Sequence, residues 1–127
     1  MSVLLDTHIF YWWLTSSERL PPNHRALIEA AGEPVYVSAV TGWEMALKAK
    51  LGKWPGVVSI LPNPEAAIRD EGFSILDISL TQAKLAGSLD LVHRDPFDRL
   101  LAAQSLDLRI PIATVDPAMA LLGAVVV

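Results

Sequence analysis

Short, nearly continuous apolar runs alternate along the chain with longer segments in which apolar residues recur at helical spacing. Runs of the first kind are typical of parallel strands that are buried on both faces. They predict strands at Val3–Leu5, Val35–Val37, Phe73–Ile78, Pro111–Thr114 and Ala124–Val127. The longer segments predict helices at Thr7–Leu14, Asn23–Ala31, Thr41–Leu51, Pro64–Asp70, Leu80–Ala86 and Pro96–Leu106.

This alternation indicates the fold class. Strands separated by helices over a whole chain predict an α/β sandwich with a mostly parallel central sheet. A length of 127 residues predicts a single domain that spans residues 1–127. The proline-containing stretch at 54–64 predicts a surface connection or a short helical turn.

Two predicted helices have notable apolar faces. The helix at 41–51 places its apolar residues on one side: Trp43, Ala46, Leu47 and Leu51. The segment Ile9–Leu14 is apolar around most of its helix, so part of it must pack on the core. The remainder is either buried as well or exposed as a patch of the kind that marks an interface.

Composition narrows the class of protein. Hydrophobic residues make up 52% of the chain, yet no apolar run approaches the ~20 residues that a membrane span needs. No basic segment and cleavage site precede the first apolar run, and the chain has no cysteine, so we expect a cytoplasmic protein without disulfides. A net charge of −4 argues against gripping nucleic acid by charge alone, but it suits a site that holds a cation.

Acidic residues stand at the ends of predicted strands and the starts of predicted helices. Asp6 follows the first strand and Asp116 follows a later one, whereas Glu44 and Asp98 lie in the first turns of helices. Because sites in open parallel sheets form at the carboxyl ends of the strands, we expect these four side chains to share one edge.

Helix capping is the alternative explanation for most of these acids. Thr41 and Glu44 fit a capping box, and Asp95 before Pro96 fits an N-cap, as does Asp116 before a proline. Asp95 is therefore expected to cap its helix rather than to bind a metal. Asp6 does not fit capping in the same way, because a carboxylate after a buried strand is costly unless it is paired or bound to a metal.

Clustered carboxylates repel one another, and a divalent cation removes that repulsion. Oxygen ligands without a histidine and cysteine set favour Mg²⁺ or Mn²⁺ over zinc. Such an ion suits phosphoryl chemistry.

The order and content of these motifs resemble a known family over essentially the whole chain. The segments are Leu4-Leu5-Asp6-Thr7-His8, Trp43-Glu44, His93-Arg94-Asp95-Pro96-Phe97-Asp98-Arg99 and Thr114-Val115-Asp116. They resemble PIN-domain ribonucleases, and more narrowly the VapC toxins of VapBC toxin–antitoxin modules. The resemblance implies a Rossmann-like α/β/α fold, Mg²⁺- or Mn²⁺-dependent endonucleolytic cleavage of RNA, a cognate VapB-type antitoxin that inhibits the enzyme, and a homodimer.

The resemblance also implies roles for individual residues. Asp6, Glu44, Asp98 and Asp116 occupy the four acidic, metal-associated positions of the family. Asp6 and Asp98 are expected to approach the metal most directly. Thr7 and Thr114 stand where hydroxyl groups support the acidic site.

Several basic and histidine residues are open to more than one interpretation. Lys48, Arg94 and Arg99 are either RNA phosphate contacts or solvated surface charges. For His8 and His93 a structural role is favoured over general-base catalysis. His24 is expected on a surface helix.

Competing functions differ in the residues that they need. A signalling receiver domain requires a paired acid after the first strand and a lysine after a late strand, and this sequence has neither. A catalytically inactive RNA-binding module would be favoured if one of the four acids were missing. A metal-dependent DNA nuclease or phosphatase on the same fold remains open.

Overall fold

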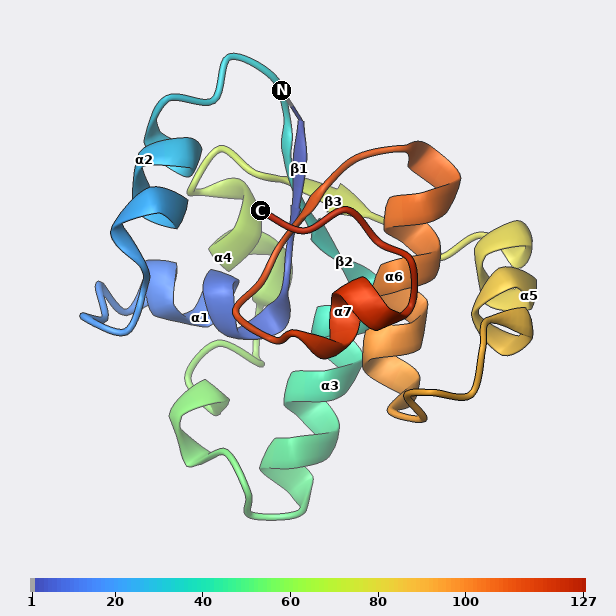
Figure 1. Cartoon of the computed structure of the whole chain (residues 1–127). Helices are drawn as coiled ribbons and strands as arrows, with labels where there is room; N and C mark the ends of the chain where they lie inside the picture. Colours follow the sequence, from blue (N-terminus) through green and yellow to red (C-terminus); the bar gives the residue numbers. More distant parts are fainter. Residues whose placement is uncertain (1) are drawn as a thin grey trace.

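The computed structural model describes residues 2–127, which contain a four-stranded parallel sheet with helices packed on both faces (Figure 1). The strands are β1 (Val3–Leu5), β2 (Val35–Ser38), β3 (Ser74–Leu76) and β4 (Ile112–Ala113), in the order β3-β2-β1-β4. Leu4 of β1 pairs with Tyr36 on one side and Ile112 on the other. The predicted α/β architecture with a parallel sheet is confirmed.

The predicted strand at Ala124–Val127 is reduced to a single bridge. Val126 pairs in parallel with Ile112, and the amide of Val127 donates to the carbonyl of Ile112 at 3.0 Å. A turn at Gly123, where φ is +93°, precedes this segment, and the amide of Ile112 also donates to the carbonyl of Val125 at 2.9 Å. The segment lies beside the edge strand β4, a placement that the sequence did not indicate.

The predicted helices all form, with ends that differ by a few residues. They are α1 (Thr7–Leu14), α2 (Pro22–Glu29), α3 (Ala39–Lys50), α4 (Pro64–Arg69), α5 (Leu80–Ser88) and α6 (Pro96–Leu108). A 3₁₀ turn, η1 (Pro55–Val57), lies in the proline-containing connection. The short helix α7 (Ala118–Leu121) was not predicted, because four residues give no helical period to detect.

The start of α3 corrects the predicted capping box. Ser38, the last residue of β2, is the N-cap, and its hydroxyl accepts a hydrogen bond from the amide of Val40 at 3.0 Å. Thr41 is instead buried inside the helix, with its Oγ1 atom 3.0 Å from Oγ1 of Thr7. Because the helix begins two residues earlier than expected, Glu44 lies in its second turn and does not cap it.

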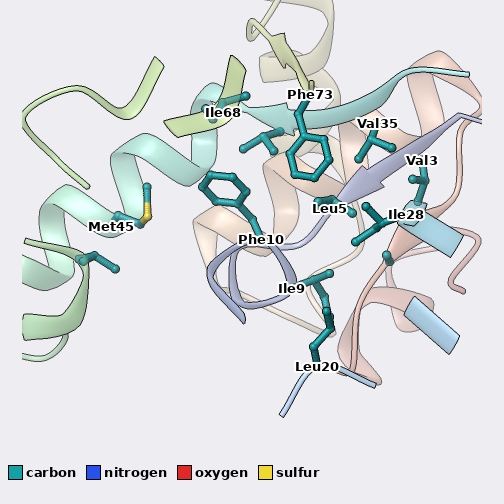
Figure 2. Packing of buried hydrophobic residues seen from close by; sticks show 13 residues of the cluster. Val3, Leu5, Ile9, Phe10, Leu20, Ile28, Val35, Met45, Ile68 and Phe73 are labelled. Atoms are coloured by element: carbon teal, nitrogen blue, oxygen red, sulfur yellow. The ribbon is translucent and has the colours of Figure 1, made fainter. Parts of the chain in front are cut away.

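Alternate residues of β1 face two separate cores. Val3 and Leu5 pack with Ile9, Phe10 and residues of α2 and α4 on one face (Figure 2). Leu4 faces the opposite side, where it packs with α6 and α7. This alternation follows from the two-residue period of a strand, and it places the carboxyl end of β1 between the two helical layers.

The aromatic residues of α1 are largely covered within the chain itself. Trp12, Trp13 and Leu14 pack against the first core, and the Tyr11 hydroxyl contacts the backbone position of Gly56 in η1. These residues of α1 are each half-buried, so the helix is neither fully buried nor fully exposed. His24, expected on a surface, is buried, and its Nε2 atom lies 2.6 Å from the carbonyl oxygen of Val127.

Apolar side chains are exposed along α3 and at its C-cap. Trp43, Leu47 and Leu51 are 47%, 39% and 56% exposed. The side of α3 that faces the cores carries Val40, Thr41, Glu44 and Met45. The apolar stripe that the sequence places on this helix thus faces outward.

No helix among residues 2–127 is both long enough and apolar enough to cross a membrane.

Candidate active site

Asp6 is held at the junction of β1 and α1. Its carboxylate is buried, and its Oδ1 atom accepts a hydrogen bond from the amide of Thr7 at 2.8 Å. Asp6 occupies the N-cap position of α1, so the expectation that capping does not explain this residue is wrong. Burial raises the pKa of Asp6, the hydrogen bond from Thr114 lowers it, and the nearby charge of Glu44 raises it further.

Thr114 links Asp6 to Asp116. Its hydroxyl donates to Oδ2 of Asp6 at 2.6 Å and accepts from the amide of Asp116 at 2.9 Å. Asp116 in turn accepts from the amide of Ala118 at 2.9 Å, which orients its carboxylate at the start of α7. A single hydroxyl therefore fixes the relative positions of two acids from different segments.

Asp98 lies in the first turn of α6. Asp95 is the N-cap of this helix, as predicted, and its Oδ1 atom accepts from the amides of Phe97 and Asp98 at 2.9 and 3.1 Å. Oδ2 of Asp98 lies 2.6 Å from Nε2 of His93. Partial burial raises the pKa of Asp98 to about 6, with His93 opposing the shift and the charges of Asp95, Asp6 and Asp116 adding to it.

Glu44 approaches the site from α3. It is 5% exposed, and its carboxylate forms an ion pair and hydrogen bond with Lys48 one turn later on the same helix. The ammonium of Lys48 also lies 5.9 Å from the centroid of the Trp54 ring. A buried carboxylate with one cationic partner is thus directed at Asp6 and the other acids.

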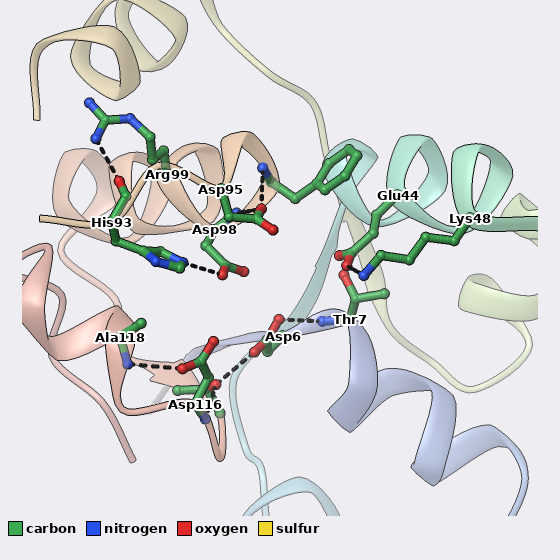
Figure 3. A network of polar contacts seen from close by, with 12 residues as sticks. Asp6, Thr7, Glu44, Lys48, His93, Asp95, Asp98, Arg99, Asp116 and Ala118 are labelled. Atoms are coloured by element: carbon green, nitrogen blue, oxygen red, sulfur yellow. Dashed lines mark hydrogen bonds and ion pairs between the residues drawn. The ribbon is translucent and has the colours of Figure 1, made fainter. Parts of the chain in front are cut away.

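The four acids point into one cleft (Figure 3). The cleft has a volume of about 430 Å³ and is lined on its acidic side by Asp6, Glu44, Asp95, Asp98 and Asp116. Its remaining wall is formed by His8, Trp12, Arg19, Lys48 and Val115. Residues far apart in the sequence therefore meet at the carboxyl end of the sheet, as their positions after strands and at helix starts predict.

A subset of these groups has the spacing of a metal site. His93, Asp98 and Asp116 each offer one ligand atom, and these atoms lie within 4.8 Å of one another. The carboxylates of Asp6 and Glu44 border the same cleft. Together with the raised pKa values of Asp6 and Asp98, which report crowded and partly desolvated carboxylates, this donor set fits a divalent cation.

Sequence reasoning gave too little weight to His93 and missed Arg19. The imidazole of His93 is hydrogen bonded locally, as expected, but its partner is Asp98 itself. The hydrogen bond to Asp98 raises the pKa of His93. Arg19 is an exposed residue in the loop after α1, and no local pattern marks it, because only the fold brings that loop to the cleft.

Arg99 is misplaced in the predicted RNA-contact set. It is 8% exposed, and its guanidinium donates to backbone carbonyls, among them those of Ala86 at 3.0 Å, Leu89 at 2.6 Å and His93 at 2.9 Å. Its role is to hold the connection between α5 and α6. Arg94 is exposed but lines a different hollow, between α5 and α6, whereas Lys48 does line the cleft.

Comparison with known proteins places this cleft in a family. The sequence profile of the PIN domain matches residues 3–124. The chain belongs to the PIN-domain family. The resemblance to PIN-domain proteins noted in the sequence is confirmed, and it covers the segments that carry all four acids.

Individual relatives of this PIN domain are distant in sequence but similar in fold. Ribonuclease VapC22 of Mycobacterium tuberculosis is 27% identical over 109 residues, which cover 84% of this chain and 80% of that protein. A crystal structure of VapBC2 from Rickettsia felis, bound to a DNA fragment from its promoter, has a TM-score of 0.69 at 13% identity and covers 100% of this chain and 98% of the other. FitAcB from Neisseria gonorrhoeae has a TM-score of 0.67 at 19% identity, with coverage of 98% and 95%.

Proposed function

We propose that this PIN domain is a divalent-metal-dependent endoribonuclease that acts as the toxin of a toxin–antitoxin pair. The observation that carries the proposal is the convergence of Asp6, Glu44, Asp98 and Asp116 in one cleft. The name of the relative Ribonuclease VapC22 supports RNA as the substrate.

Asp6, Asp98, Asp116 and Glu44 would hold Mg²⁺ or Mn²⁺. Bound there, the ion would polarise the scissile phosphate and favour deprotonation of the attacking water. Thr114 keeps Asp6 and Asp116 in fixed relative positions, and Asp95 orders the first turn of α6 so that Asp98 faces the cleft. Thr7 contributes its amide to Asp6 and its hydroxyl to Thr41, which ties α1 to α3.

The basic residues of the cleft wall would position the RNA backbone. Arg19 is exposed, and Lys48 retains 30% exposure of its side chain beside Glu44. Phosphate contacts of this kind set the position of a strand without reading its sequence. They also offset, locally, the repulsion between RNA and a chain of net charge −4.

We also propose a cognate VapB-type antitoxin and a homodimer. The similar structures include VapBC2 and a toxin–antitoxin complex from Klebsiella pneumoniae, the latter with a TM-score of 0.58 at 22% identity over 90% of this chain and 86% of that one. The outward apolar stripe of α3, formed by Trp43, Leu47 and Leu51, supports a protein interface on that helix.

Cleavage by the purified, antitoxin-free chain tests the enzymatic part of the proposal. Single-stranded RNA, single-stranded and duplex DNA, and a small phosphate monoester are incubated with Mg²⁺, with Mn²⁺ or with EDTA. Internal cleavage of RNA alone, dependent on the metal and lost in Asp98→Asn, is expected. Asp70→Asn is the matched control, because it removes an exposed carboxylate at the end of α4, outside the cleft.

The alternatives give distinct results in the same assay. RNA binding without cleavage under any metal condition would identify an inactive RNA-binding module. Equal or faster cleavage of DNA would identify a DNA nuclease. Expression in cells, alone and together with the gene product encoded beside it, tests toxicity and its suppression by an antitoxin.

A further inference from the structure

His93 faces the space that the carboxylates of Asp98 and Asp116 share (Figure 3). One ligand atom from each residue lies within 4.8 Å of the other two. Donor atoms at about 2.0–2.2 Å from one ion lie at most about 4.4 Å apart. Rotations of a few side-chain torsions therefore convert this spacing into a single coordination set that contains a nitrogen atom.

The backbone around His93 is anchored by hydrogen bonds from the side chain of Arg99. The carbonyl of His93 accepts a hydrogen bond from Nη1 of Arg99 at 2.9 Å, and the same nitrogen donates to the carbonyl of Asp90 at 2.7 Å. Arg99 directly follows Asp98 on α6 and is buried. Asp98 and Arg99 are thus neighbours on α6, and Asp98 contacts the imidazole of His93 while Arg99 holds the backbone of His93. This arrangement limits how far the imidazole and the Asp98 carboxylate can separate.

We propose that His93 is a ligand of the divalent ion, together with Asp98 and Asp116, and that it biases the centre towards Mn²⁺ over Mg²⁺. This inference rests on the proposed metal-dependent function. Mg²⁺ demands oxygen ligands and keeps several waters, whereas imidazole nitrogen binds transition-metal ions. Oxygen ligands alone would bind Mg²⁺ and Mn²⁺ comparably. A nitrogen ligand added to a carboxylate centre therefore favours Mn²⁺, the transition-metal ion of the two.

His8 provides a matched comparison within the same cleft. It is exposed, lines the cleft wall and stacks on Trp54 with ring centroids 4.7 Å apart and an interplanar angle of 13°. It does not belong to the group of ligand atoms found among residues 2–127. Replacing it removes one imidazole from the cleft without altering the proposed ligand set.

The test measures the bound ion directly, apart from any cleavage. Purified full-length wild type, His93→Gln and His8→Gln are titrated with Mn²⁺ and with Mg²⁺ by calorimetry, and the Mn²⁺ complexes are examined by electron spin-echo envelope modulation. This method detects nitrogen nuclei bonded to Mn²⁺. Glutamine preserves the length and hydrogen-bonding capacity of His93, and thermal unfolding confirms that each variant is folded.

The expected result is nitrogen modulation in wild type and in His8→Gln, and its loss in His93→Gln. The ratio of Mn²⁺ to Mg²⁺ affinity should fall by about tenfold in His93→Gln, at the lower end of the losses seen when metal sites are disturbed. Mn²⁺ binding to wild type without nitrogen modulation would overturn the inference and leave the proposed carboxylate enzyme standing. An equal loss of both affinities in His93→Gln would also overturn it, since His93 would then only orient Asp98. Failure of wild type to bind either ion would remove the inference and the proposed metal dependence together.

Discussion

The hydroxyl of Thr114 donates a hydrogen bond of 2.6 Å to the carboxylate of Asp6, a residue 108 positions earlier in the chain. This contact joins the carboxyl ends of the adjacent strands β1 and β4. It also lowers the pKa of a carboxyl group that burial raises. Burial raises the pKa of Asp6, and the pairing of β1 with β4 adds an opposing hydrogen bond from Thr114 to the one that the adjacent amide of Thr7 supplies.

Thr114→Val should move the acid limb of the cleavage profile to higher pH. The variant keeps the shape of the side chain but removes the hydrogen bond that favours ionised Asp6, so the pKa of Asp6 rises further. A charge-assisted hydrogen bond of about 1.5 kcal/mol corresponds to a shift of about one pH unit. The rate of RNA cleavage measured from pH 5 to 9 reports the shift. Thr114→Ser retains the hydroxyl, and identical profiles for the two variants would contradict the argument.

Divalent-ion binding should weaken as the pH falls through about 6. Asp98, with a pKa raised from 3.8 to about 6, must lose its proton before it can bind a cation. Below this value the affinity should fall at least tenfold for each pH unit, and the raised pKa of His93, whose imidazole must also be neutral to bind the ion, should extend the decline to higher pH. Calorimetric titration with Mn²⁺ at four pH values measures the dependence. An affinity that stays constant down to pH 4.5 would show that Asp98 ionises as an ordinary aspartate.

Asp98→Asn should stabilise the metal-free protein at pH 7. Because the folded-state pKa of Asp98 is raised above its unfolded value, its favourable contribution exists below pH 3.8 and is lost as the pH rises through about 6. Partial exposure reduces the effect to about 1 kcal/mol, which raises the melting temperature by about 4 °C. Calorimetric melting in EDTA checks this. With saturating Mg²⁺ the wild type should instead be more stable than Asp98→Asn, because only the wild type gains the full free energy of metal binding.

The sheet and the convergence of the acids could both be predicted from the sequence. The sheet follows from the spacing of apolar residues, and the convergence follows from the positions of the acids after strands and at the starts of helices. The apolar runs identify β1 to β4, and parallel strands bring residues such as Asp6 and Asp116 to one edge. The local sequence could not show which side of α3 packs against the cores. Its outward stripe of Trp43, Leu47 and Leu51 is as apolar as a buried face, and only the packing against both cores shows that Glu44 and Met45 point inward.

The surroundings of the charged side chains on α6 also could not be predicted from the local sequence. Asp98-Arg99 is one contiguous motif in the sequence, yet its two charged side chains face different surroundings. Helix geometry turns adjacent side chains about 100° apart. Asp98 faces the cleft, and Arg99 faces the carbonyl groups at the end of α5. Which of two neighbouring charged side chains is buried depends on the segments that pack against each side of the helix.

Arg99→Met should destabilise the fold by about 3 kcal/mol. The substitution keeps an apolar stem but leaves buried carbonyls, including those of Ala86 and His93, without their donor. Arg99→Lys should recover only part of the loss, because an ammonium cannot reproduce the fork of donors. Urea unfolding gives the free energies. Lys84→Met, at an exposed position of α5, is the control, and equal midpoints for it and Arg99→Met would contradict a structural role for Arg99.

Arg19 should contribute one phosphate contact that Arg94 does not. Each neutralised phosphate of a single strand adds about 0.7 to the slope of log affinity against log salt concentration. In the Asp98→Asn background, which is expected to prevent cleavage, Arg19→Met should therefore lower that slope by about 0.7. Arg94→Met should leave it unchanged, because Arg94 lines the hollow between α5 and α6, whereas Arg19 lines the acidic cleft. Fluorescence anisotropy with labelled RNA over a range of salt concentrations measures the slope. A lower slope for Arg94→Met but not for Arg19→Met would place the RNA path over α5 and α6.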